Sequence, residues 1–205
     1  MITQKKELKF YLMADRMMNR GQFKLSISQR IKEIVFPDYI MEYLICLRKV
    51  SFYKHGGGIL NKLFYLHYLR KLRRLSSYLG ISIGCDVFGY GLLIPHWGTI
   101  VVGARPRIGN YAVLHTGICI TDTDKVIGNC LYMSTGAKIT AQVILGDNIT
   151  VAANSVVTHS FENNMLIGGA PAKMIKESKS WVERDSRTDK VKAIEELKVR
   201  MGIKQ

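Results

Sequence analysis

A six-residue repeat is the feature that most restricts how this chain can fold. An aliphatic residue or methionine recurs every six residues between positions 102 and 157, with a single seven-residue step. The positions are Val102, Ile108, Leu114, Ile120, Ile127, Met133, Ile139, Leu145, Val151 and Val157. A period of six fits neither a helix nor an isolated strand. It fits a solenoid in which each hexapeptide forms one flat side of a coil and its aliphatic side chain points to the axis.

Helical patterns flank the repeat on both sides. Leucines recur at three- and four-residue intervals from Ile59 to Leu79, and Gly80 follows as a natural helix stop. We expect these leucines to form core, because closing the end of a solenoid requires an apolar face. The sequence therefore predicts three parts. They are a helical cap over 1–80, the solenoid over 81–160, and an exit loop with a C-terminal helix over 161–205.

A larger irregularity lies near the start of the repeat. Ile94 and Val102 are eight residues apart instead of six, so two extra residues must bulge within IPHWGTIV. A bulge ejects side chains from the regular pattern of inward and outward positions. His96, Trp97 and Gly98 lie in that stretch.

The chain is strongly basic, with a formal net charge of +14. Such a charge is compatible with nucleic acid, an anionic membrane face or a polyanionic small ligand. We find no DNA-reading motif and no aromatic stacking signature, so we expect no specific nucleic-acid partner. There is no apolar run of 18 residues and no signal-peptide pattern. The missing apolar run predicts that there is no transmembrane segment. The four cysteines lack metal or disulfide spacing, so we expect a cytoplasmic protein.

Two further stretches, together with the hexapeptides, carry a family resemblance. GLLIPHWGTIVVG (91–103) and GGAPAK (168–173) resemble the left-handed β-helix acyltransferases, most closely their serine acetyltransferase-like branch. That branch includes O-acetyltransferases of surface-polysaccharide gene clusters. The resemblance covers about 80–175. It implies a left-handed parallel β-helix, a homotrimer, and acetyl-CoA lying in a cleft between neighbouring solenoids.

The resemblance also implies roles for individual residues. A histidine at the position of His96 acts as general base and takes the proton of the acceptor hydroxyl, which attacks the thioester directly. This agrees with elementary chemistry, because an imidazole titrating near neutral pH can accept that proton. The residues expected along the coenzyme are Thr135, Ala153, Gly169, Ala170 and Pro171, with Lys173 reaching a phosphate. Possible orienting or substrate-binding residues are His115, Asp122, Asp124 and Trp97, and no metal is expected.

Departures from the serine acetyltransferase pattern determine the expected acceptor. Those enzymes have an aspartate just before the histidine, where this chain has Pro95. Their second catalytic aspartate aligns with Ile81, a further histidine aligns with Asp124, and the long loop before that position is absent. We therefore expect O-acetylation of a sugar or surface-polysaccharide precursor, in polysaccharide biosynthesis. The alternatives are a serine O-acetyltransferase of cysteine biosynthesis and a non-catalytic trimeric scaffold.

A metal enzyme on the same solenoid, of the γ-carbonic-anhydrase type, is a further rival. It requires three histidines that converge on zinc. His96, His115 and His159 do not have that spacing.

Overall fold

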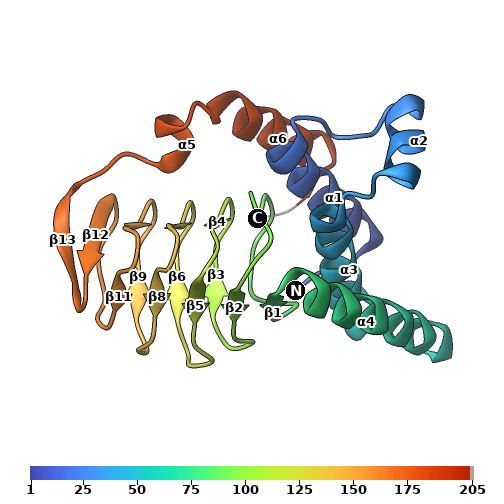
Figure 1. Ribbon diagram of the computed structural model, residues 1–205. Coiled ribbons are helices and arrows are strands. Elements are labelled where there is room, and N and C mark those ends of the chain that lie inside the picture. Colours follow the sequence, from blue (N-terminus) through green and yellow to red (C-terminus); the bar gives the residue numbers. More distant parts are fainter. Residues whose placement is uncertain (204–205) are drawn as a thin grey trace.

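The computed structural model describes residues 1–203 and shows a β-solenoid with helices at one end (Figure 1). Three sheets form its sides. Sheet A contains β1 (Ile81–Ile83), β2 (Ile100–Val102), β5 (Ile118–Ile120), β8 (Lys138–Ile139) and β11 (Val156–Val157). Sheet B contains β3 (Arg107–Ile108), β6 (Val126–Ile127) and β9 (Ile144–Leu145). Sheet C contains β4 (Val113–Leu114), β7 (Tyr132–Met133), β10 (Thr150–Val151), β12 (Met165–Gly169) and β13 (Ala172–Glu177).

The six-step residues form the axis of the solenoid. Every one of them is buried, from Val102 to Val157, with at most 4% of its surface exposed. Successive coils pair in parallel, for example Val101 with Cys119 and Cys119 with Lys138. Only β12 and β13, at the far end, pair antiparallel among the described strands. The predicted solenoid is confirmed.

Four helices precede the first coil. They are α1 (Lys5–Arg20), α2 (Ile27–Val35), α3 (Tyr39–Lys54) and α4 (Ile59–Leu79), and α4 runs directly into β1. A buried ion pair joins α1, α3 and the first coil, because Arg48 donates to Asp15 (2.8 Å) and to the carbonyls of Phe88 (2.7 Å) and Gly89 (2.6 Å). A buried guanidinium is stable only when its donors are satisfied in this way.

The leucine stripe of α4 does not behave as expected. Leu72, Leu75 and Leu79 are buried against α3 and the first coil, but Leu60, Leu63 and Leu66 are 58–68% exposed. The expectation that the whole stripe is core is wrong. The reason is that the N-terminal half of α4 projects past the end of the solenoid, where nothing packs on its outer face (Figure 1).

The C-terminal segment returns along the outside of the solenoid to the helical end (Figure 1). It contains α5 (Trp181–Arg184) and α6 (Thr188–Arg200). Trp181 is buried and its indole N–H donates to the Tyr111 carbonyl (2.9 Å), while α6 packs on α1. The segment thus ties both ends of the molecule together. None of the helices within residues 1–203 has the length and hydropathy needed to cross a bilayer.

Candidate active site

His96 lies in the irregular loop 95–99, at the corner between sheets C and A. The loop leaves sheet C after Leu93, which bridges to Val113, and enters sheet A at Ile100. His96 and Trp97 are both exposed, and Trp97 retains 70% of its surface. Gly98 has φ of 143°, a conformation that favours glycine, and its N–H donates to the Leu79 carbonyl (2.9 Å). The Gly98 amide is therefore already used in anchoring the loop to α4.

Helix α1 holds the chain on the other side of His96. The Asn19 amide donates to the Leu92 carbonyl (2.8 Å) and accepts from the Ile94 N–H (3.2 Å). The Asp15 carboxylate accepts from the Leu92 N–H (3.0 Å). These side chains satisfy backbone groups that no neighbouring coil could reach, since the first coil has no coil before it. Sequence reasoning missed both residues, because a polar side chain on an expected helix gives no sign of what it contacts.

His115 occupies the same corner one coil further on. Its Nε2 lies 2.8 Å from the Tyr132 hydroxyl. Burial lowers the pKa of His115, and the nearby charge of His96 lowers it further. The structure thus brings His96 and His115 into electrostatic contact.

The C-terminal segment covers Tyr132, the hydrogen-bond partner of His115. The Arg184 guanidinium stands over the Tyr132 ring at 4.4 Å from its centroid, an attractive cation–π geometry. The His115–Tyr132 hydrogen bond therefore lies between the exposed His96 loop and α5.

The residues expected along the coenzyme stack on this same corner. Gly136 N–H donates to the Thr116 carbonyl (2.9 Å), and Asn154 N–H donates to the Thr135 carbonyl (3.0 Å). The β10–β12 register, carried two residues past Val151 and Ile167, aligns Ala153 with Gly169. Adjacent coils are about 4.8 Å apart, so this row runs roughly 14 Å from Thr116 to Gly169.

Most residues of this row are small, and their side chains are exposed. Thr135, Ala153, Gly169, Ala170, Pro171 and Lys173 are all exposed. The β12–β13 turn closes the row, and there the Gly169 N–H donates to the Ser155 hydroxyl (3.0 Å). The corner is therefore a shallow edge of small residues with His96 at one end and Lys173 near the other.

Asp122 and Asp124 lie on a different corner, between sheets A and B. Asp122 accepts from the N–H groups of Ala104 (2.8 Å) and Arg105 (2.9 Å), and Asp124 pairs with the Arg105 guanidinium (2.6 Å). They fix the turn 103–106. Within one chain these contacts hold neither carboxylate beside His96, so a role for Asp122 or Asp124 in orienting His96 or binding substrate stays a prediction. The seven-residue step from Ile120 to Ile127 places them on a different corner of the coil from the histidine.

Asp86, a third carboxylate near the first coil, forms its hydrogen bonds with residues at the C-terminal end of α3. It accepts from the Ser51 hydroxyl (2.6 Å) and contacts His55 Nε2 (3.0 Å). Burial alone would raise the pKa of Asp86, but the hydrogen bonds from Ser51 and His55 lower it to about 2. It joins α3 to the turn after β1 and is distant in the fold from the His96 loop.

The histidines do not gather around a common point. His96 and His115 share one corner, whereas His159 follows β11 on another and stacks beside Phe161, with 4.5 Å between ring centroids. Within residues 1–203, no group of three His, Cys, Asp or Glu side chains is arranged to hold a metal ion.

Trp97 forms one wall of a cleft of about 720 Å³ between the loop and the helical end. The other lining residues come from the helices and their connections: Arg20, Val35, Phe36, Pro37, Asp38, Tyr39, Ile40, Tyr78 and Leu79. Sequence reasoning did not foresee this cleft, because it forms between segments about sixty residues apart.

Comparison with known proteins identifies serine acetyltransferases among its relatives. No protein-family model matches the chain. It is 27% identical over 114 residues to the serine acetyltransferase of Synechococcus elongatus, covering 52% of this chain and 46% of that protein. It is 29% identical over 114 residues to the serine acetyltransferase of Helicobacter pylori strain J99, covering 52% and 66%. The chain thus spans about half to two thirds of the length of these curated relatives.

Solved structures of serine acetyltransferases show the same fold. The soybean apoenzyme superposes with a TM-score of 0.63 at 20% identity, covering 82% of this chain and 69% of that one. The Brucella abortus strain S19 enzyme in complex with coenzyme A gives 0.62 at 23% identity, covering 85% and 68%. The predicted fold class, a left-handed parallel β-helix with a helical cap and a C-terminal helix, is confirmed.

These relatives overturn one expectation. The sequence departures at Pro95, Ile81 and Asp124 suggested a sugar or polysaccharide acceptor, but the curated relatives and the solved structures reported above are serine acetyltransferases. The expectation of a sugar acceptor and of polysaccharide biosynthesis is wrong. The resemblance of this chain to the left-handed β-helix acyltransferases, in their serine acetyltransferase-like branch, is confirmed.

Proposed function

We propose that this protein transfers the acetyl group of acetyl-CoA to the hydroxyl of serine. The observation that carries the proposal is the position of His96. An exposed imidazole stands at the head of a row of small residues that runs through Thr135 and Ala153 to Gly169. The similarity to serine acetyltransferases from two organisms supports the choice of acceptor.

The chemistry that we assign to this corner is a single direct transfer. His96 accepts the proton of the serine hydroxyl while the oxygen attacks the thioester carbonyl of acetyl-CoA. The tetrahedral intermediate collapses with loss of the coenzyme thiolate, which takes the proton back from the imidazolium. The products are O-acetylserine and free coenzyme A, so atoms and charge balance without an acyl-enzyme. Holding both substrates at one corner supplies much of the rate.

The row from Thr135 to Pro171 is where we place the coenzyme, with Lys173 toward its phosphates. Because the row is a shallow edge in one chain, we propose that a homotrimer deepens it into a groove between neighbouring solenoids. Catalysis is assigned to residues 81–160 and the exit turn, while 1–80 holds the first coil. We further propose a cytoplasmic location, where acetyl-CoA is formed and where the free thiols of Cys46, Cys85, Cys119 and Cys130 stay reduced.

A thiol-release assay tests the proposal. Incubation with acetyl-CoA and L-serine should release free coenzyme A and form O-acetylserine, detected by mass spectrometry. Release without serine, or no release with it, contradicts the proposal. In the latter case, binding of coenzyme A without turnover would favour the non-catalytic scaffold, for which the replacement of a catalytic aspartate by Pro95 is the specific observation.

A further inference from the structure

The outer face of α4 is divided along its length into an apolar half and a cationic half. Positions three or four residues apart lie on one face of a helix. Ile59, Leu63 and Leu66 therefore continue into Arg70, Arg73 and Arg74 along a single stripe. We call these six residues the α4 stripe. Figure 1 shows the N-terminal half of α4, which carries the apolar residues of the stripe, projecting beyond the first coil.

The apolar half of the stripe is unusually accessible. Ile59 is 76% exposed, Leu63 58% and Leu66 59%, and the adjacent Leu60 and Phe64 are 68% and 47% exposed. Five neighbouring large apolar side chains form a contiguous patch, and such patches on soluble proteins mark interaction sites.

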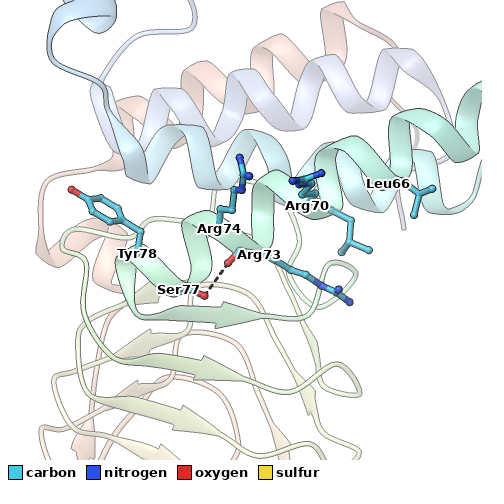
Figure 2. A pocket seen from close by; sticks show the side chains of 7 residues that line it. Leu66, Arg70, Arg73, Arg74, Ser77 and Tyr78 are labelled. Carbon is cyan, nitrogen blue, oxygen red and sulfur yellow. Dashed lines mark hydrogen bonds between the residues drawn. The ribbon is translucent and has the colours of Figure 1, made fainter.

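The cationic half offers three unpaired guanidinium groups. Arg70, Arg73 and Arg74 are exposed, and within residues 1–203 none of them forms a salt bridge. Helix α4 itself contains no Asp or Glu. They line a shallow groove of about 880 Å³ whose remaining walls are Leu66, Leu69, Ser77 and Tyr78. Figure 2 shows the three arginines along α4, with Arg70 and Arg74 pointing to one side of the helix and Arg73 to the other.

We propose that the α4 stripe docks on the surface of an anionic lipid bilayer. In this arrangement the apolar half enters the boundary between headgroups and acyl chains, and the arginines bind lipid phosphates. An amphipathic helix that joins large apolar residues to Arg or Lys fits such a surface. Guanidinium groups suit phosphates because their planar donors match two oxygens at once.

The alternative occupant, a second copy of the chain, fits the charges less well. A two-fold contact between copies brings the same surface of both together. It would place six arginines against each other with no carboxylate on either α4. An anionic surface neutralises the arginines instead, and the formal net charge of +14 adds long-range attraction. The proposal is independent of the acetyl-transfer reaction.

Vesicle flotation of the full chain tests the docking. The protein should float with vesicles that contain phosphatidylglycerol, stay behind with pure phosphatidylcholine, and be released from the anionic vesicles by high salt. Replacing one arginine, as in Arg73→Gln, should weaken binding about fivefold, and Arg70→Glu/Arg73→Glu/Arg74→Glu should abolish it. Leu63→Ser/Leu66→Ser should also lose most binding. The matched control Lys24→Glu/Lys192→Glu/Arg200→Glu makes the same charge change at exposed sites outside α4 and should float like the wild type.

Four results would overturn the proposal. They are no binding to either vesicle, equal binding to both, full binding by the triple α4 variant, and loss of binding by the control. An assembly that becomes smaller in Leu63→Ser/Leu66→Ser would overturn it too, because the stripe would then join copies of the chain. Circular dichroism confirms that each variant is folded, and lipid-free acetyl transfer should not change, which separates failure of docking from failure of the proposed reaction.

Discussion

The side-chain amide of Asn19, on α1, bridges the Leu92 carbonyl and the Ile94 N–H, two residues before His96. A helix of the cap thus fixes the position of the backbone from which the loop 95–99 leaves the first coil. Because displacement of a catalytic group by about 1 Å can cost a hundredfold in rate, Asn19 is a positioning residue for the proposed base.

We predict that Asn19→Ala lowers kcat about ten- to a hundredfold and changes KM for serine and acetyl-CoA little. The lost hydrogen bonds should also lower the free energy of unfolding by roughly 1–2 kcal/mol. Steady-state kinetics and urea unfolding measure both effects. Asn19→Asp keeps an oxygen for the Ile94 N–H and loses the donor to Leu92, so its kcat should be intermediate. A kcat equal to wild type in Asn19→Ala would remove this role.

The lowered pKa of His115 predicts a stability that depends on pH. Burial, with the His96 charge, depresses the pKa in the folded state, so the unfolded chain binds the proton first as the pH falls. Stability therefore decreases as the pH drops below about 6.5, the ordinary histidine value, and becomes constant below the folded-state pKa. Urea unfolding between pH 8 and pH 5 measures the slope, and His115→Gln should flatten it. An unchanged slope in that variant would show that other groups are responsible.

The buried Arg48–Asp15 pair predicts a large and asymmetric effect on stability. Arg48→Met leaves Asp15 as an uncompensated buried charge, so the free energy of unfolding should fall by about 3–5 kcal/mol. Adding Asp15→Leu removes that charge and should restore part of the loss. Recovery should be incomplete, because Arg48 also serves the carbonyls of Phe88 and Gly89. Complete recovery in the double variant would show that those two bonds contribute little.

A bulky side chain at Ala153 should obstruct the proposed coenzyme row. Ala153 is exposed on the corner that continues from His96, so Ala153→Phe should fold normally and raise KM for acetyl-CoA about tenfold or more, equivalent to ~1.4 kcal/mol of lost binding. Gln142→Phe places the same ring on the corner between sheets A and B and is the matched control. If both variants behave alike, the coenzyme does not lie along the row.

The solenoid could be predicted because its period is written directly in the sequence. Each of the residues at the six-residue positions, from Val102 to Val157, is buried in the stack of coils, so a local pattern determines a global packing. The leucines of α4 show where such reasoning stops. Periodicity places Leu63 and Leu72 on a helix. Only the extent of the first coil and α3 along that helix determines that Leu63 is exposed and Leu72 is buried.

The site could be predicted only in part, for similar reasons. The eight-residue step indicates the irregular loop around His96, and His115, 19 residues later, lies one coil further on. The role of Asn19 could not be predicted, because its contact with Leu92 joins positions 73 residues apart. The departures at Pro95, Ile81 and Asp124 point away from serine, whereas the similarity of the chain to serine acetyltransferases points toward it.

The most direct measurement is serine-dependent release of coenzyme A by the wild type and by His96→Gln, with coenzyme A binding measured in parallel by calorimetry. Wild-type turnover that falls about a hundredfold or more in the variant, with coenzyme binding unchanged, is the predicted result. A variant that turns over serine as fast as the wild type would contradict the role of His96 as the base.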